Sequence, residues 1–170
     1  MVDGRQFLLS EKEYRAEDFS CVRLPDGYYL SFHKDLRLYA HREYPILLLG
    51  IAWQTDPERP DPETVLEDLA KAYGGDIPER ELLAAEETWC GRYALLAGGR
   101  VYLDAAGLLG VFFGSGGVSS SCRILAASMG LPEKRFASSS SLNWLPGPLT
   151  QYEEIRTLPP SQIYDYRSGS

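Results

Sequence analysis

Two stretches between Val101 and Gly130 carry residue types that could do chemistry. Asp104 and Gly107 form an Asp-x-x-Gly turn after an apolar run, and a segment reading FGSGGVSSSC follows it. Glycines let a backbone approach a phosphate closely, and a helix that begins at the serines would direct N–H groups toward it. The segment from Ser115 to Ser120 is therefore either a phosphate-binding loop or a glycine turn followed by a serine helix cap.

Other candidate groups are sparse and far apart. The cysteines Cys21, Cys90 and Cys122 have wide spacings and form no C-x-x-C motif, which argues against a disulfide framework and a zinc site. His33 and His41 flank a charged segment without the spacing of metal ligands, so we expect them at the surface or at strand ends. This cysteine usage favours a reducing, cytoplasmic location.

The elements that must position these residues are helices and short strands. A helix is predicted from Asp61-Pro62, because Asp is a good N-cap and Pro suits the first helical position, to the Gly74-Gly75 stop. A second helix is expected over 78–87, and a third from a serine cap near Ser120 to Met129. Strands are expected within 26–40, 44–53, 91–97, 100–105, 108–114 and 161–166.

These strands carry apolar residues on both faces. The links at Gly98-Gly99 and between Asp104 and Gly107 are too short for parallel crossovers, which take about a dozen residues or more. The sequence therefore predicts an α+β fold with antiparallel sheet and helices outside it.

Length and charge limit the function classes. The chain has 170 residues, 44% of them hydrophobic and 24% charged, which fits one globular domain. Its net charge is −7 and no cluster of Lys and Arg stands out, so we expect neither nucleic acid nor membrane as a partner. The first residues lack the features of a signal peptide, and the longest apolar run, PILLLGIAW, is far shorter than the roughly 18 residues of a membrane span.

The segment GRYALLAGGRVYLDAAGLLGVFFG resembles the glutamine amidotransferase domain of asparagine synthases. That family has a Gly-x-(Phe/Tyr)-Ala strand, a hairpin, and an Asp-x-x-Gly turn that leads into an aromatic strand. The matching residues here are Gly91, Tyr93, Ala94, Asp104, Gly107, Phe112 and Phe113. VSSSCRILAASMGL is similar to the family's next strand and helix, and WLPGPLTQYEEIRTLPPSQIYDY to its closing segment, so the resemblance runs from about Ile46 to Tyr166.

The resemblance implies an N-terminal-nucleophile hydrolase fold. This is a four-layer αββα sandwich, in which two stacked antiparallel sheets lie between helices. It implies an amidotransferase-like domain over 1–166, followed at 167–170 by a cut chain end or a linker. It also implies a partner, an asparagine-synthase-like synthetase domain of the same or a neighbouring gene, which would bind ATP and Mg. A homodimer is left open.

The residues that hydrolyse glutamine in that family are missing here. Active members have a Cys directly after the initiator Met, whose thiol attacks glutamine while its α-amino group serves as base. Here that position is Val2, and Cys21 is internal. The strand LLLGIAWQTD also lacks the Asn-Gly pair that binds the oxyanion. We therefore expect no catalytic, cofactor-binding or metal-binding residue in this chain.

Two structural or vestigial roles are assigned instead. Asp104 and Gly107 are expected to form a structural turn. Asp61, Ser119 and Ser120 are the residues of a vestigial pocket, because an Asp near the start of the first helix holds the substrate amino group in active members. The N-cap role of Asp61 explains that residue equally well.

These observations lead to one hypothesis and two alternatives. The hypothesis is a catalytically silent scaffold domain of an asparagine-synthase-like, ATP-dependent, amide-forming enzyme. The alternatives are a stand-alone module that binds a small ligand or regulates, and a hydrolase with an unrecognised nucleophile. For the scaffold we expect an exposed docking patch around Trp144, Leu145 and Tyr152.

Overall fold

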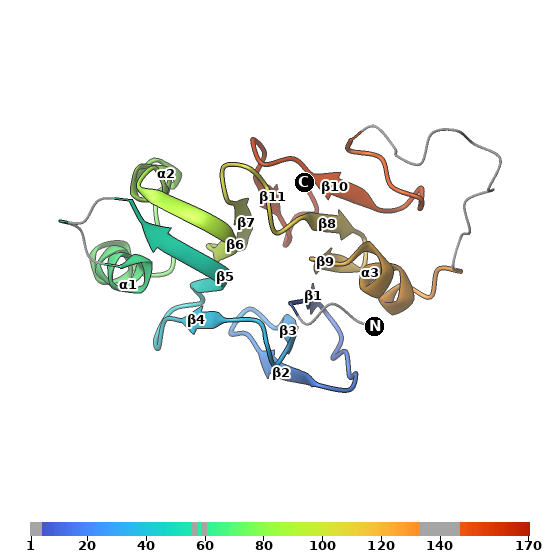
Figure 1. Cartoon of the computed structure of the whole chain (residues 1–170). Helices are drawn as coiled ribbons and strands as arrows, with labels where there is room; N and C mark the ends of the chain where they lie inside the picture. The colour runs from blue at the N-terminus through green and yellow to red at the C-terminus, as the bar shows by residue number, and fades with distance from the viewer. Residues whose placement is uncertain (1–4, 56–57, 59–60, 133–146) are drawn as a thin grey trace. The chain divides into compact units, whose positions relative to one another are not determined.

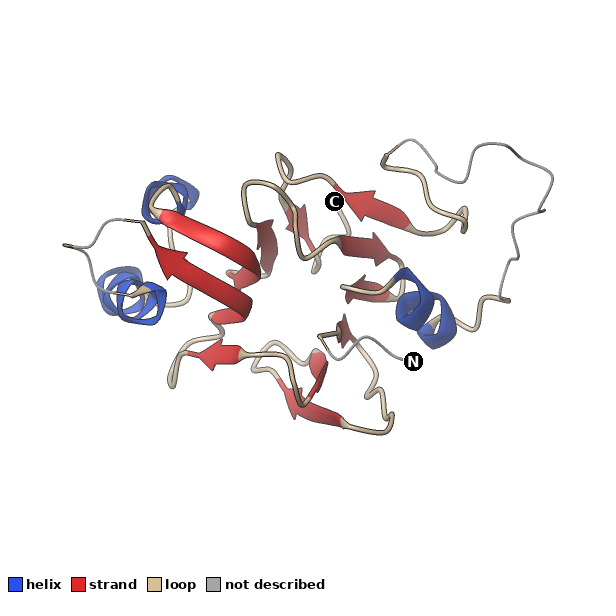
Figure 2. Ribbon diagram, in the orientation of Figure 1, coloured by secondary structure: helices blue, strands red, loops and turns tan. Residues whose placement is uncertain are grey.

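The structure is a computed structural model that describes residues 5–55, 58, 61–132 and 147–170 (Figures 1 and 2). The chain divides into two compact units. The first contains the described residues of 1–35 and 110–159, and the second those of 36–109 and 160–168, with the last two residues divided between them. Each unit holds one antiparallel sheet and at least one helix, which confirms the predicted α+β class.

A six-stranded sheet forms the frame of the first unit. Its order is β10-β8-β9-β1-β3-β2, and all neighbours in it are antiparallel. Helix α3 (Cys122–Ser128) packs on one face of this sheet through a core of Leu8, Ile124, Leu125, Ala126, Tyr152 and Ile155. The strands are β1 (Phe7–Ser10), β2 (Phe19–Arg23), β3 (Tyr29–His33), β8 (Val111–Gly114), β9 (Gly117–Ser119) and β10 (Arg156–Leu158).

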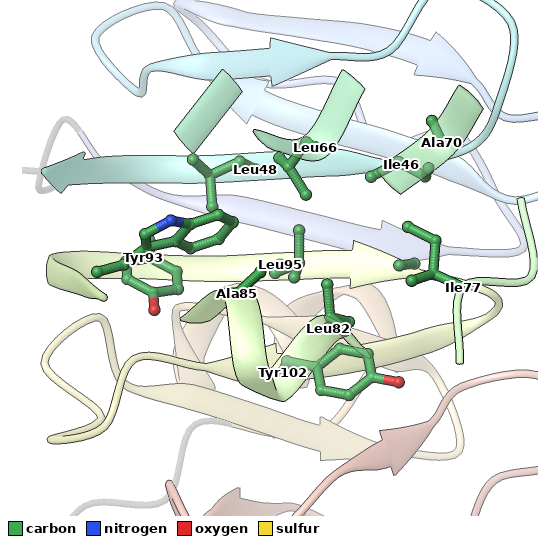
Figure 3. Packing of buried hydrophobic residues seen from close by; sticks show 12 residues of the cluster. Ile46, Leu48, Leu66, Ala70, Ile77, Leu82, Ala85, Tyr93, Leu95 and Tyr102 are labelled. Carbon is green, nitrogen blue, oxygen red and sulfur yellow. The ribbon is translucent and has the colours of Figure 1, made fainter. Parts of the chain in front are cut away.

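The second unit has a five-stranded sheet in the order β11-β7-β6-β5-β4, again antiparallel throughout. Helices α1 (Pro62–Tyr73) and α2 (Glu79–Glu86) cover one face, and their Leu66, Ala70, Leu82 and Ala85 share a core with side chains of β5 and β6 (Figure 3). The strands are β4 (Leu38–Ala40), β5 (Leu47–Gln54), β6 (Trp89–Ala97), β7 (Arg100–Leu103) and β11 (Tyr164–Asp165).

Each sheet also carries buried apolar side chains on the face turned away from its helices. Directly paired residues of an antiparallel ladder point to the same side, so the register sorts the two faces. In the first unit these residues, each at most 3% exposed, are Phe7, Leu9, Leu30, Val111, Val118 and Leu158. In the second, each at most 6% exposed, they are Leu47, Leu49, Ala94, Leu96, Val101 and Leu103. Neither sheet therefore has the fully solvated face that is common in antiparallel sheets.

The predicted helices are present, with one change of cap. Asp61 caps α1 by accepting a hydrogen bond from the N–H of Thr64 at 3.1 Å. The cap of α3 is Ser121, whose hydroxyl accepts from the N–H of Ile124, and not Ser120. The hydroxyl of Ser120 instead accepts from the N–H of Phe7.

The connections between strands differ from expectation at one place. The hairpin at Gly98-Gly99 is confirmed, since Ala97 of β6 pairs with Arg100 of β7. The short link after Asp104 is interpreted from the sequence as a turn within antiparallel sheet, but it does not join paired strands, because β7 belongs to the five-stranded sheet and β8 to the six-stranded one. That link instead carries the chain from one sheet to the other, and the next hairpin is β8–β9.

Tyr152, expected in an exposed patch, and His33, expected at the surface or at a strand end, are both buried. Tyr152 is 1% exposed in the core under α3, so it is not part of an exposed patch, while Trp144 and Leu145 lie outside the described residues. His33 stands at the end of β3, as expected, but is buried. In the part of the chain that the structure describes, no helix combines the length and the apolar character needed to cross a membrane.

Candidate functional site

The Asp-x-x-Gly turn is built around the buried carboxylate of Asp104. Its Oδ1 accepts hydrogen bonds from the N–H groups of Ala106 and Leu108 at 3.2 and 3.0 Å. Its Oδ2 accepts from those of Tyr93 and Leu109 at 3.3 and 3.4 Å. The residue is 3% exposed. Because four backbone donors converge on a carboxylate removed from water, Asp104 organises the turn and ties it to β6.

Gly107 closes the same turn. Its N–H donates to the carbonyl oxygen of Asp104 at 2.8 Å, and its φ of +61° lies in the left-handed region. A Cβ at this position would lie 3.2 Å from Cγ of Pro160. Both the backbone conformation and the space therefore favour glycine.

Gly107→Val is expected to lower the free energy of unfolding by about 1–3 kcal/mol, because a β-branched residue is strained at this φ. The measurement is the urea midpoint. The matched control is Gly110→Val, since Gly110 has φ +58° but no atom within 4 Å of an added Cβ. The difference between the two variants isolates crowding against Pro160, and an unchanged midpoint for Gly107→Val would show that the turn tolerates side chains.

Glu86 lies one turn beyond the buried Leu82 on α2, in the last turn of the helix. Its Oε1 is buried and accepts no hydrogen bond, and Glu86 forms no ion pair with any described residue. Burial, and after it the negative charge of Asp104, raise the pKa of Glu86 from 4.5 to about 8. At pH 7 this carboxyl is therefore mostly protonated.

Tyr93, whose pKa is affected by Glu86, lies in a layer that contains buried polar groups without hydrogen-bond partners. Trp89 packs edge-on against Tyr93, with ring centroids 5.9 Å apart, and Gln54 is the ladder partner of Trp89 (Figure 3 shows the layer around Tyr93). The indole nitrogen of Trp89 and both amide atoms of Gln54 are buried without a hydrogen-bond partner. Burial, then the charges of Glu86 and Asp104, raise the pKa of Tyr93. Buried titratable groups in such surroundings are where functional sites concentrate.

The serine run ties the start of α3 to β1. The hydroxyl of Ser119 donates to the carbonyl oxygen of Phe7 at 2.6 Å and accepts from the N–H of Ser121 at 3.0 Å. The hydroxyl of Ser120 accepts from the N–H of Phe7 at 3.0 Å. Both serines of the expected vestigial pocket thus have structural hydrogen bonds within the first unit.

The glycine run before these serines is explained by strand packing. Ser115 and Gly116 form the turn between β8 and β9. A Cβ on Gly117, which has φ +126°, would collide with the carbonyl oxygen of Leu9. The neighbouring surface hollow of about 500 Å³ is lined by one lysine and two glutamates, Lys12, Glu11 and Glu13. This charge balance favours the glycine turn over a phosphate loop.

Asp61, the third residue of the expected pocket, belongs to the second unit. Besides capping α1, it lines a surface hollow of about 300 Å³ together with His41. Nδ1 of His41 accepts from the N–H groups of Glu43 and Tyr44 at 3.1 and 3.2 Å. Both side chains therefore have local structural roles at the rim of this hollow.

The three cysteines are free thiols. Burial raises the pKa of Cys122, which makes it a weaker nucleophile at neutral pH. The Sγ of Cys21 accepts from the hydroxyl of Ser31 at 3.3 Å. Among the described residues no hydrogen bond joins a cysteine to a histidine, and no group of three His, Cys, Asp or Glu could hold a metal.

The molecule is thus an α+β protein of two antiparallel sheets, in which the buried Asp104 of the Asp-x-x-Gly turn acts electrostatically on the partly buried Glu86. No protein family, no curated protein and no solved structure matches the chain. What the chain does must therefore be inferred from its own residues and geometry.

Sequence reasoning did not single out Glu86 as a site residue. A signal was present, since Glu86 follows the apolar Leu82 by four positions and so lies on the same helix face. A charged residue at such a position is ordinarily taken to reach solvent, and only the folded structure shows that Oε1 of Glu86 is buried and that the charge of Asp104 acts on it.

Proposed function

We propose that this chain is a catalytically silent, glutamine-amidotransferase-like scaffold domain of an asparagine-synthase-like enzyme that forms amides at the expense of ATP. In that enzyme a partner synthetase domain binds ATP and Mg, adenylates a carboxylate and joins it to an amine. The observation that carries the proposal is that each of two antiparallel sheets has a helix-covered face and an opposite face of buried apolar side chains.

Stacking these two apolar faces produces the four-layer αββα sandwich that we propose for the whole chain. Burial of apolar surface stabilises by about 25 cal/mol per Å², so two such faces are a strong reason for stacking. The link after Asp104 supports it as well, because the chain leaves a strand of one sheet there and enters a strand of the other within seven residues, 104–110.

Two features support a silent rather than an active domain. The first strand begins at Phe7, and the N–H of Phe7 donates a hydrogen bond to the hydroxyl of Ser120. This nitrogen belongs to a peptide bond, so it is not a free amino group that could act as a base. The raised pKa of Cys122 and the hydroxyl partner of Cys21 leave those thiols without activation. Val2 lies outside the described residues.

The test combines this chain with the synthetase encoded downstream of it or beside it. We expect a complex by sedimentation velocity, and a synthetase that loses solubility or activity when the chain is removed. In the same samples we expect no glutamate release from glutamine above a heat-treated control. This separates the docking function from glutaminase activity in one experiment.

Two outcomes would contradict the proposal in different ways. A synthetase that is equally soluble and active alone, and that forms no complex, would favour the stand-alone binding or regulatory module. Glutamate release that disappears in Cys21→Ala or Ser115→Ala would favour the hydrolase with an unrecognised nucleophile. Cys90→Ala is the matched control for the cysteine variant, because Cys90 is a free, exposed cysteine.

A further inference from the structure

Helix α2 is held more weakly than α1. It has eight residues, its N-cap Pro78 makes no side-chain cap hydrogen bond, and it buries only Leu82 and Ala85. Helix α1 has 12 residues and is capped by the Asp61 side chain. The last turn of α2 contains no basic residue and ends in acidic ones, where the negative end of the helix dipole disfavours carboxylates. The docking of α2 therefore depends on few contacts.

The position of Glu86 in the docked helix is favourable only while its carboxyl group is neutral. The titratable groups that face Glu86 are Asp104 in the turn after β7, Tyr93 on β6 and Tyr102 on β7. Asp104 is a carboxylate, and the two tyrosines are buried and bring no positive charge. An ionised Glu86 would therefore add a second negative charge close to Asp104, with one carboxylate oxygen buried and without a hydrogen-bond partner.

The cations of neighbouring elements form no ion pair with Glu86 in the described part of the chain. On α1, which also contacts α2, Lys71 lies 3.9 Å from Glu67 and 3.8 Å from Asp68. On β7, Arg100 interacts with the side chain of Tyr102 and lies 3.8 Å from Glu79 and 4.0 Å from Asp165. Arg92 directly precedes Tyr93 on β6, so its side chain points to the opposite face of the sheet. None of these three cations pairs with Glu86, so its ionisation is not compensated within the described residues.

We propose that α2 is a pH-operated flap, released from the sheet when Glu86 loses its proton and docked again when Glu86 regains it. Release uncovers the apolar layer formed by Leu82, Ala85 and Trp89. The inference rests on the second unit alone and does not depend on the proposed scaffold function.

The direction follows from proton binding. The docked form holds the Glu86 proton with a pKa of about 8, whereas a solvated glutamate has 4.5, so the docked form binds the proton more tightly. Raising the pH through this window therefore favours release. The ratio of released to docked helix rises by up to about tenfold per pH unit, roughly three orders of magnitude in all, and is constant above pH 8.

The test is hydrogen exchange of backbone amides in the whole chain between pH 5 and 9. Intrinsic exchange also accelerates with pH, so each α2 rate is divided by the rate of the same amide in Glu86→Gln, which mimics the neutral carboxyl. We expect this ratio to rise by up to about tenfold per unit below pH 8 and then to level off. Glu87→Gln, at the exposed next residue, should behave as the unchanged protein does.

Amides of β6 distinguish a flap from general destabilisation. They should show no such rise relative to Glu86→Gln, because the sheet stays paired when α2 is released. A ratio for α2 that stays flat from pH 5 to 9 would overturn the proposal. So would a rise of the same size in β6, since it would mean that ionisation of Glu86 unfolds the whole unit.

Discussion

Leu125→Ala is expected to lower the free energy of unfolding by about 2–5 kcal/mol. Leu125 is fully buried on α3 and packs in a core with Leu8, Tyr152 and Ile155. The substitution removes apolar surface from this core and leaves a cavity. How far the neighbours collapse into that cavity decides where in the range the loss falls.

Urea unfolding followed by circular dichroism measures the effect. The matched control is Leu149→Ala in the same unit, because Leu149 is 44% exposed and its truncation should change stability by no more than about 0.5–1 kcal/mol. Equal losses for the two variants would mean that α3 does not anchor the first unit through its apolar face.

Elements whose signals are local could be predicted from the sequence. Helix α1 has its Asp61 cap, its first-turn Pro62 and its Gly74 stop within a short window, and all three have those roles in the structure. The hairpin at Gly98-Gly99 is likewise marked by two consecutive glycines, which have φ +59° and +85°. In both cases the determinants lie within a few residues of the element itself.

Strand partners could not be predicted, because they depend on distant residues. The link after Asp104 has the length of a hairpin, yet it joins strands of different sheets. The hydrogen bonds from backbone N–H groups to Asp104 determine the local shape of the turn. They do not determine which strand pairs with β8. The short strand β1 also lacked a usable pattern, because all of Phe7–Ser10 are buried and no alternation appears.

Of the two acidic residues of the candidate site, only Asp104 could be predicted from the sequence. Asp104 could be singled out from its Asp-x-x-Gly spacing, which the turn requires. Glu86 could not, because its raised pKa arises from burial against groups that the fold brings from β6 and from the turn after β7. A helix pattern shows which face is apolar, but not whether a carboxyl at its margin reaches water.

Asp104→Asn is expected to lower the free energy of unfolding by about 2–4 kcal/mol at pH 5. The asparagine keeps one acceptor oxygen but replaces the other with an NH₂ group that faces backbone N–H donors. Hydrogen bonds to a charged acceptor contribute about 1.5–3 kcal/mol each, and two of the four around Asp104 are long, at 3.3 and 3.4 Å. Urea unfolding measures the loss, and Asp76→Asn, at an acidic residue outside the turn, is the control.

The loss caused by Asp104→Asn should become smaller as the pH rises to 9. The charge of Asp104 helps to raise the pKa of Glu86, so removing it lets Glu86 ionise in the folded protein at a smaller free-energy cost. In the Glu86→Gln background no carboxyl group can ionise at this position, so the loss of stability caused by Asp104→Asn should be the same at pH 5 and pH 9. The unchanged protein, the two single variants and the double variant form a double-mutant cycle at each pH. The coupling energy between Asp104 and Glu86 should appear only at the higher pH. A loss that does not change with pH in the Glu86 background would show that the charge of Asp104 does not reach Glu86, and that burial alone keeps Glu86 protonated.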